Sequence, residues 1–408
     1  MKKIIFILVV IFYPFVSHAD EWINKKFNNA YLQGVSFPET EIGYICGGNQ
    51  IFRTEDAGNT WQIQTTGLNS TQLLYNVVFV NSSVGCAVGK NGTVIRTTDG
   101  GDTWISIGPS GATQNFWGVT IFSPLEIIVS GASGSIYKTT NGGNTWTSCS
   151  NPVSSIFFEI AFIGMTGYTT AQQPNFSFAK SSNQGNNWSL SPISDFSGYG
   201  VTSVGSSLYL AGENLSTNKL RIIKSTDGGQ TWDSQIMNEH GNFVDISFSN
   251  EMKGFALSKG YFTSSIYKTI DGGNSWQFVV TFNTLLNDIY CTANHVYAVG
   301  DSGNIYTSEI TVGIEHISEN VEGYSLSQNF PNPFNPETNI KFSISQSGNV
   351  KLTVFDITGK EVESLVNEKL SAGTYAYNFN ASNLPSGTYF YKIETDNFVE
   401  TKKMVLIK

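Results

Sequence analysis

Three acidic residues stand at one recurring position of the chain and could together do acid–base chemistry. Glu159, Asp245 and Asp288 lie in the short apolar runs FFEIAF, NFVDISF and LLNDIYC. A pair of carboxyl groups, one protonated and one ionised, is the usual machinery for hydrolysing a glycosidic bond. Solvated carboxylates without catalytic duty are commoner, so the three acids are catalytic candidates only, and the identity of any catalytic set stays open.

A column of aromatic residues comes one position before the acids. Aligning seven such runs places an aromatic in four consecutive ones, at Tyr75, Trp117, Phe158 and Tyr199. Rings at the same end of neighbouring repeats could stack sugar rings or hold an apolar peptide. They could equally wedge between the repeats as core. We therefore expect either a ligand-binding arc or a set of packing residues at these positions.

A second motif sets the spacing of these runs. The stretch STDGGQTW ends at Trp232, and its near-copies end at Trp61, Trp104, Trp146, Trp188 and Trp276. Successive tryptophans are 42–44 residues apart. A period of about 40–50 residues, built from short β-rich runs, predicts the blades of a β-propeller.

Each repeat predicts four antiparallel strands. In the second repeat, the runs YNVVFVN, VGCAVGKNG and TVIRTT are followed by a fourth strand that begins at the tryptophan of DGGDTW. The last repeat, 287–310, lacks both the motif and the fourth strand. Residues 21–37 resemble the missing piece, with Trp22 in the tryptophan column. We therefore predict seven blades over 20–310, closed by the N-terminal strand, which removes two exposed sheet edges.

The motif resembles the Asp-box, or BNR, repeat over roughly residues 21–310. Its Asp or Asn accepts hydrogen bonds from N–H groups of a tight turn, and its glycine takes a positive φ. Because two copies carry Asn, which is no acid, the motif is interpreted as structural. The structural positions expected are Asp56, Asp99, Asn141, Asn183, Asp227 and Asp271. The resemblance implies that these turns lie on the face away from any ligand.

The blade pattern is most similar to photosystem II stability and assembly factor-like proteins. Other Asp-box propellers include sialidases, sortilin-type receptors and xyloglucan hydrolases. A sialidase needs three clustered arginines, but Arg53 and Arg96 share a strand position with lysines of other repeats. The xyloglucan hydrolases use two propellers, and one is predicted here. No metal, phosphate-binding or nucleophile motif occurs, so we expect no cofactor and no metal, and a non-enzymatic role is favoured.

Both ends of the chain carry targeting signals. Residues 1–19 have the charged start, apolar run and small-residue cleavage site of a signal peptide; an uncleaved anchor is the alternative. After a linker at 311–323, residues 324–408 predict a small Ig-like β-sandwich. Their PNPFNP, VFDITGKEV and LPSGTYFYKIET stretches resemble the C-terminal sorting domain of type IX secretion substrates. An ordinary adhesion module is the alternative.

These features define the expected location and partners. The sorting-domain resemblance implies a Bacteroidetes-like bacterium, export by the type IX machinery through residues 324–408, and a secreted or cell-surface protein. A net charge of −9 offers no basic stripe for nucleic acid, and no later run is long enough to span a membrane. We expect a propeller that binds a glycan or a surface protein. A glycan-active hydrolase and an envelope assembly or stability factor are the alternatives.

The four cysteines show no paired spacing that would hold a zinc ion. Cys46 and Cys86 occupy matching places in neighbouring repeats, whereas Cys149 and Cys291 do not. We expect buried, reduced thiols. A disulfide between Cys46 and Cys86 is the alternative if the matching strands come close enough.

Overall fold

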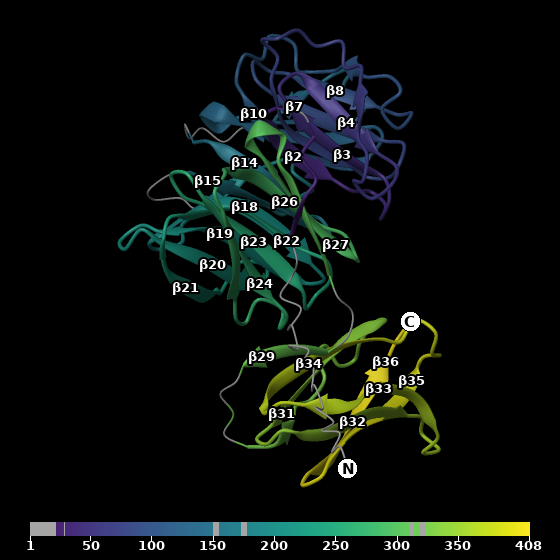
Figure 1. Cartoon of the computed structure of the whole chain (residues 1–408). Coiled ribbons are helices and arrows are strands. Elements are labelled where there is room, and N and C mark those ends of the chain that lie inside the picture. Colours follow the sequence, from purple (N-terminus) through teal and green to yellow (C-terminus); the bar gives the residue numbers. More distant parts are fainter. Residues whose placement is uncertain are drawn as a thin grey trace, which may run out of the picture.

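The computed structural model describes residues 22–27, 29–149, 155–172, 178–310, 314–318, 321 and 323–408. The predicted signal peptide, residues 1–19, lies outside this part. The described chain is all-β: it forms 36 strands and two single-turn 3-10 helices, η1 (Ala132–Gly134) and η2 (Asp301–Gly303). The strands fall into two groups, one before residue 310 and one after residue 313 (Figure 1). No helix in the described residues is long and apolar enough to cross a membrane.

The described residues up to 310 form seven four-stranded antiparallel sheets. The first strand of each sheet contacts the first strands of both neighbours, so these strands form a closed inner ring. Blades 1 to 6 are numbered in chain order, and blade 7 contains the last repeat. The inner strands are β2 (Leu32–Ser36), β6 (Leu74–Phe79), β10 (Phe116–Ser123), β14 (Phe157–Ile163), β18 (Phe196–Val204), β22 (Asn242–Phe248) and β26 (Leu286–Cys291).

The remaining strands of each blade follow outward in order. The second strands are β3 (Gly43–Gly47), β7 (Gly85–Gly89), β11 (Glu126–Gly131), β15 (Thr166–Ala171), β19 (Ser207–Asn214), β23 (Gly254–Lys259) and β27 (His295–Gly300). The third strands are β4 (Gln50–Thr54), β8 (Val94–Thr97), β12 (Ile136–Thr139), β16 (Phe178–Ser181), β20 (Lys219–Ser225), β24 (Ser264–Thr269) and β28 (Ile305–Glu309). The outer strands are β5 (Gln62–Gln64), β9 (Ile105–Ser106), β13 (Thr147–Ser148), β17 (Ser189–Ser191), β21 (Asp233–His240), β25 (Gln277–Phe282) and β1 (Ile23–Asn24).

The N-terminal strand joins the sheet of the last repeat. β1 pairs antiparallel with β28, with Ile23 opposite Thr307. Trp22 packs edge-on against Phe282 of the preceding blade, with ring centroids 5.7 Å apart. The first and last described segments of the propeller therefore lie in one sheet.

The hydrophobic core lies between neighbouring blades. One buried cluster, for example, joins Tyr209 and Ile222 of blade 5 to Phe243 and Ile246 of blade 6. At the other end of the inner strand, a box tryptophan packs edge-on against a phenylalanine, as Trp104 does with Phe79 at 5.9 Å. Sheets packed face to face in this closed order place their inner edges around a common channel.

Basic residues of the third strands connect successive blades. The Lys138 ammonium donates to the Gln184 carbonyl at 2.7 Å and pairs with Glu126 at 2.8 Å. The Lys180 ammonium likewise donates to the Gly228 carbonyl at 2.6 Å. Each cation thus reaches the box turn of the next blade. These basic residues therefore make structural contacts between blades, and they are not arranged as the arginine triad of a sialidase.

The C-terminal strands form two four-stranded sheets. The orders are β29-β34-β31-β30 and β33-β32-β35-β36. Buried side chains from both sheets, such as Phe342 and Tyr391, make one core. Asn250, on the β22–β23 turn, donates to Glu337 at 2.9 Å and so connects the propeller to this region. The strands are β29 (Ile314–Ser318), β30 (Ser325–Leu326), β31 (Glu337–Ile344), β32 (Gly348–Phe355), β33 (Glu361–Leu370), β34 (Gly373–Asn380), β35 (Gly387–Thr395) and β36 (Val399–Leu406).

All four cysteines are free and buried. Burial raises the pKa of the Cys86 thiol to about 12. The matching cysteines of blades 1 and 2 are therefore small core residues and do not form a disulfide.

Candidate functional site

The inner strands enclose a cavity of about 200 Å³ to which every blade contributes. Its lining includes Val35 of β2, Val119 of β10 and Val201 of β18. β14, β22 and β26 contribute the three acids singled out in the sequence. The channel is thus acidic at blades 4, 6 and 7, and apolar or uncharged polar side chains line it elsewhere.

Each inner strand has an irregularity at the two aligned columns. In blade 2, Leu74 pairs with Gly89, but Asn76 pairs with Val88, so Tyr75 is an extra residue. The other six inner strands shift register at the corresponding place. A β-bulge re-aims the side chains beside it and bends its strand. At this place in each inner strand, the usual alternation of side chains between the two faces of the sheet is interrupted. The aromatic and acidic columns lie at this interruption.

The four predicted aromatic residues form a continuous arc. The rings of Tyr75 and Trp117 are nearly parallel, with centroids 5.9 Å apart. Trp117 contacts Phe158 at 6.0 Å, and Phe158 contacts Tyr199 at 5.3 Å. All four side chains are half-buried. We call Tyr75, Trp117, Phe158 and Tyr199 the aromatic arc; its rings pack on one another and remain partly open to solvent.

Side chains of neighbouring blades fix the backbone of the arc. Asn76 donates to the Trp117 carbonyl at 3.1 Å. The Ser130 hydroxyl donates to the Phe158 carbonyl at 2.7 Å, and the Thr170 hydroxyl donates to the Tyr199 carbonyl at 2.6 Å. Three of the four arc residues therefore have their backbone carbonyl bonded to the preceding blade.

The remaining three positions of the same column are not aromatic. Gln33, Val244 and Asn287 occupy them. Asn287 accepts from the Lys259 ammonium at 2.5 Å and donates to Asp301 at 3.2 Å. The channel mouth is therefore aromatic over blades 2 to 5 and largely polar over blades 6, 7 and 1.

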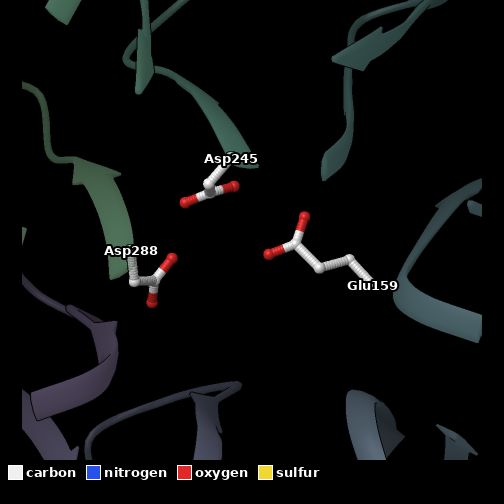
Figure 2. A group of neighbouring side chains, drawn as sticks. All are labelled: Glu159, Asp245 and Asp288. Carbon is white, nitrogen blue, oxygen red and sulfur yellow. The ribbon is translucent and has the colours of Figure 1, made fainter. Parts of the chain in front are cut away.

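The structure brings the three predicted acids together inside the channel. Carboxylate oxygens of Glu159, Asp245 and Asp288 all lie within 4.8 Å of one another. Figure 2 shows the three side chains pointing toward one another from separate strands. Asp245 is only 5% exposed, and the other two are half-buried. We call these residues the channel carboxylates.

Each channel carboxylate accepts a hydrogen bond from the next blade. Glu159 accepts from the Val201 N–H at 3.0 Å. Asp245 accepts from the Ile289 N–H at 2.8 Å, and Asp288 accepts from the Val35 N–H at 2.7 Å. The inner strands are sheet edges with unpaired backbone groups. The acids therefore join the inner edges of blades 4 and 5, 6 and 7, and 7 and 1.

Glycine at the same column gives the acids their space. A Cβ at Gly200 would lie 2.8 Å from the Asp245 Cα, and one at Gly34 would lie 2.9 Å from the Asn76 Cα. Neighbouring inner strands come so close here that a side chain must point along the channel or be absent. Gly200 precedes Val201 on β18, and its missing side chain leaves room for the close approach of Asp245 on the next blade.

Burial and like charge shape the protonation of the cluster. Burial raises the pKa of Glu159 well above its ordinary value, the neighbouring Asp245 raises it further, and the Val201 N–H opposes the shift. Burial, followed by Asp245, likewise raises the pKa of Asp288. Three carboxylates this close cannot all ionise without a proton or a cation among them. Oxygen ligands of this kind suit a hard cation such as Ca²⁺.

This grouping of three acids, which could hold a cation, was not apparent in the sequence. No metal motif connects the three acids, and they come from three different blades. Their shared column was the available signal, but the column alone did not show that they meet. Within the described residues, they are the one group of three or more acidic, histidine or cysteine side chains placed to hold an ion.

The six box positions lie on six separate turns and form no common site. Asp99 accepts from the Thr103 N–H at 2.9 Å and from the Thr103 and Thr97 hydroxyls at 2.6 and 2.7 Å. Asn141 accepts from the Thr145 N–H at 2.9 Å in the same geometry. Equivalent bonds close the turns at the remaining positions, Asp56, Asn183, Asp227 and Asp271. These donors lower the pKa of the Asp99 carboxyl to about 2.

The fold and the repeated turns define an Asp-box β-propeller followed by a smaller β-domain. Residues 16–156 match the family model described as photosynthesis system II assembly factor YCF48. Residues 328–408 match the family model described as secretion system C-terminal sorting domain. Both resemblances seen in the sequence are confirmed. The sorting domain makes this a secreted or cell-surface protein handled by the type IX secretion machinery.

Solved structures share the propeller fold. One is described as YCF48 bound to D1 peptide (TM-score 0.59, 17% identity, covering 71% of this chain and 97% of that chain). A second is YCF48 from Cyanidioschyzon merolae (TM-score 0.58, 17% identity, 70% and 98% covered). A third is the GH74 xyloglucanase from Xanthomonas campestris (TM-score 0.56, 10% identity, 79% and 59% covered). No curated protein sequence matches the chain. At these identities the likeness establishes the fold alone.

Proposed function

We propose that this secreted propeller is a binding protein whose ligand, a segment of another surface protein or a glycan, lies across the aromatic arc. The observation that carries the proposal is the continuity of the arc, in which four rings on consecutive blades touch in sequence. Rigid aromatic rings supply large contact area at low entropic cost. Hydrogen bonds from preceding blades hold the backbone at three of these four positions, which supports a preformed surface.

The polar side of the mouth supports an oriented ligand. Lys259, Asn287 and Asp301 form a hydrogen-bonded set opposite the arc. Below both sides lie the channel carboxylates, whose acceptor oxygens suit an ammonium, a guanidinium or a sugar hydroxyl. A ligand could therefore place apolar surface on the arc and a polar group over the channel.

The comparisons favour a protein ligand. A propeller of the same fold is described with a bound D1 peptide, and residues 16–156 match an assembly-factor family. An envelope assembly or stability factor would be such a binding protein, with a partner at the cell surface. An assembly factor would use the same binding site as the main proposal. The two roles differ only in what binding does for the partner.

Binding of peptides and glycans by residues 20–408 tests the proposal. We would select peptides from a random twelve-residue display library and screen a glycan array, then titrate the hits by calorimetry. Trp117→Ala should weaken binding by about tenfold or more, as expected for a central aromatic anchor. Met165→Ala is the matched control, because Met165 is 63% exposed on the β14–β15 turn, away from the arc. Unchanged affinity in a folded Trp117→Ala protein would reject the arc.

Glycoside hydrolysis is the second candidate, and the raised pKa of Glu159 is the observation that favours it. A general acid needs a pKa shifted in this direction beside an ionised partner. The backbone bonds to all three carboxylates favour a structural role instead. We expect no reducing ends from soluble polysaccharides. If the parent released reducing ends and the Asp245→Asn variant did not, the binding proposal would be replaced by a hydrolase.

A further inference from the structure

The turn between β23 and β24 carries two aromatic side chains in water. Tyr261 is 94% exposed and Phe262 is 84% exposed. The Gly260 N–H donates to the Thr263 carbonyl at 2.8 Å and closes the turn around them. Such turns usually hold Gly, Asn, Asp, Ser or Pro, which suit the backbone and the solvent. Two large rings at the tip contribute nothing to the turn, so their exposure needs another explanation.

A pocket of about 260 Å³ lies beside this turn, between blades 5 and 6. We call it the lateral pocket. Leu220 and Tyr267, both buried, and the exposed Phe278 give it apolar surface. Phe278 meets Tyr267 edge-on, with centroids 5.8 Å apart. Gly260 and Thr263 belong to its lining, so the turn that carries the two exposed aromatic residues borders the pocket, although neither ring lines it.

Polar groups alternate with this apolar surface. Glu239 and His240 line the pocket and are exposed. The hydroxyls of Ser265 and Thr281 lie 2.7 Å apart at its wall. The Tyr267 hydroxyl interacts with the Glu239 carboxylate. The pocket therefore offers hydroxyl, imidazole and carboxylate groups close to ring faces.

The charge of the lining narrows the class of ligand. Among the described residues that line the pocket, Lys259 alone carries a permanent positive charge, and its ammonium is bonded to Asn287. A phosphate or a uronic acid would need more cationic groups than this. A purely apolar ligand would displace water from Glu239 and His240 without offering hydrogen bonds in return. The remaining class is a neutral molecule with apolar faces and many hydroxyls.

We propose that the lateral pocket binds one ring of a neutral polysaccharide, with Tyr261 and Phe262 stacking against the sugar chain at the rim. Sites for drug-sized ligands are roughly 300–1,000 Å³, so a cavity slightly smaller than this suits a single ring of a longer chain. Glu239 accepts from sugar hydroxyls, and Phe278 meets the C–H face. The pocket shares no residue with the aromatic arc. It has only Lys259 in common with the polar side of the channel mouth, so it is a second site, and its ligand does not depend on the aromatic arc.

Affinity electrophoresis of residues 20–408 tests this site. Gels would contain xyloglucan, laminarin or galactomannan as neutral probes and alginate as an anionic one. We expect at least one neutral polysaccharide to retard the protein, and Phe262→Ala or Tyr261→Ala to weaken that retardation by about fivefold or more, as loss of an aromatic contact predicts. Adding Glu239→Gln to either aromatic variant should weaken the retardation further. Met165→Ala should migrate as the parent does.

Several results would overturn the proposal. These are the absence of retardation by every neutral polysaccharide, a preference for alginate, or equal retardation of the parent and both aromatic variants. Because Tyr261 and Phe262 are exposed, their variants should keep the parent's thermal midpoint, so a binding loss is not a folding loss. Binding abolished by Trp117→Ala but kept by Phe262→Ala would support the aromatic arc and reject the lateral pocket. The reverse pattern would do the opposite.

Discussion

Two sets of acidic side chains in the propeller behave in opposite ways. At the box turns, donors of the same turn surround an exposed carboxylate, and the pKa of Asp99 falls to about 2. In the channel, burial and neighbouring acids raise the pKa of Glu159 and of Asp288. Both sets accept backbone hydrogen bonds, so the bonds alone do not decide the direction.

The difference lies in water and in like charge. A box acid stands alone on a solvated turn and receives at least three donors, which favour the anion. A channel carboxylate receives one bond from the next blade and faces two other acids in a small cavity. The same residue type therefore accepts turn hydrogen bonds as an anion at the box, whereas at the inner edge of the blade its environment favours the protonated form.

The largest expected effect concerns the pH dependence of stability. Because folding raises the pKa of Glu159 and Asp288 above their ordinary values of 4.5 and 3.8, their favourable contribution is complete at low pH and is lost as pH rises through the folded values. With a chelator present, the parent's thermal midpoint should decrease as the pH is raised from about 5 to about 8, a range that lies above the ordinary pKa values of both acids. Glu159→Gln with Asp288→Asn should remove this fall and raise the midpoint at the higher pH by about 2–4 °C per kcal/mol of relieved repulsion.

Differential scanning fluorimetry across pH measures this effect. Replacing the chelator by calcium provides the control, since a cation among the three carboxylates should restore the parent's midpoint and leave that of the double variant unchanged. Identical pH profiles for the parent and the double variant would show that the channel carboxylates do not repel one another in the folded protein.

A smaller effect is expected at the box turns. Asp99→Ala removes the acceptor of three bonds and should lower the thermal midpoint at neutral pH by several degrees. Asp99→Asn should lower it much less, because Asn141 makes the backbone bond of the same turn without a charge. Since folding lowers the pKa of Asp99, its contribution is present above pH 3.8 and is lost as pH falls toward 2. Equal losses in the Ala and Asn variants would contradict the hydrogen-bond explanation.

The smallest effect should be seen at the thiols, for which burial is the largest cause of the raised pKa. Burial raises the pKa of Cys86 to about 12, and all four cysteines are buried. Iodoacetamide at mildly alkaline pH should therefore leave the native protein unlabelled and label four thiols after denaturation. Rapid labelling of the native protein, read by mass spectrometry, would show that the blades open locally.

The class of fold was predictable from the sequence, but the geometry of the channel was not. Tryptophans at 42–44-residue intervals and glycine-rich turns are local signals, and they correctly predicted an all-β propeller. The sorting-domain motifs were equally local. The alignment also placed Tyr75 and Trp117 in one column of adjacent repeats, so their proximity in space could be expected. Whether these residues bind a ligand remains a prediction.

The meeting of the acids depends on features that a sequence does not display. The bulge at Tyr75 and its equivalents is visible only in the strand register. The missing side chain of Gly200 matters because Asp245 of the adjacent strand comes close to it. The lateral pocket likewise depends on which side chains of two outer strands face each other. Long-range packing decides these contacts, so periodicity could not reveal them.

The pairing of β1 with β28 has a consequence for how the chain acquires its structure. Asn24 donates to Asn304, a partner 280 positions away along the chain. Closing so long a loop is entropically unfavourable, and contacts of this separation form slowly. The N-terminal strand must therefore wait, unpaired, until the last repeat has been synthesised and has folded beside it. Chains interrupted before that point would expose strand edges ready to pair with other molecules, so incomplete chains should be the species most prone to aggregate.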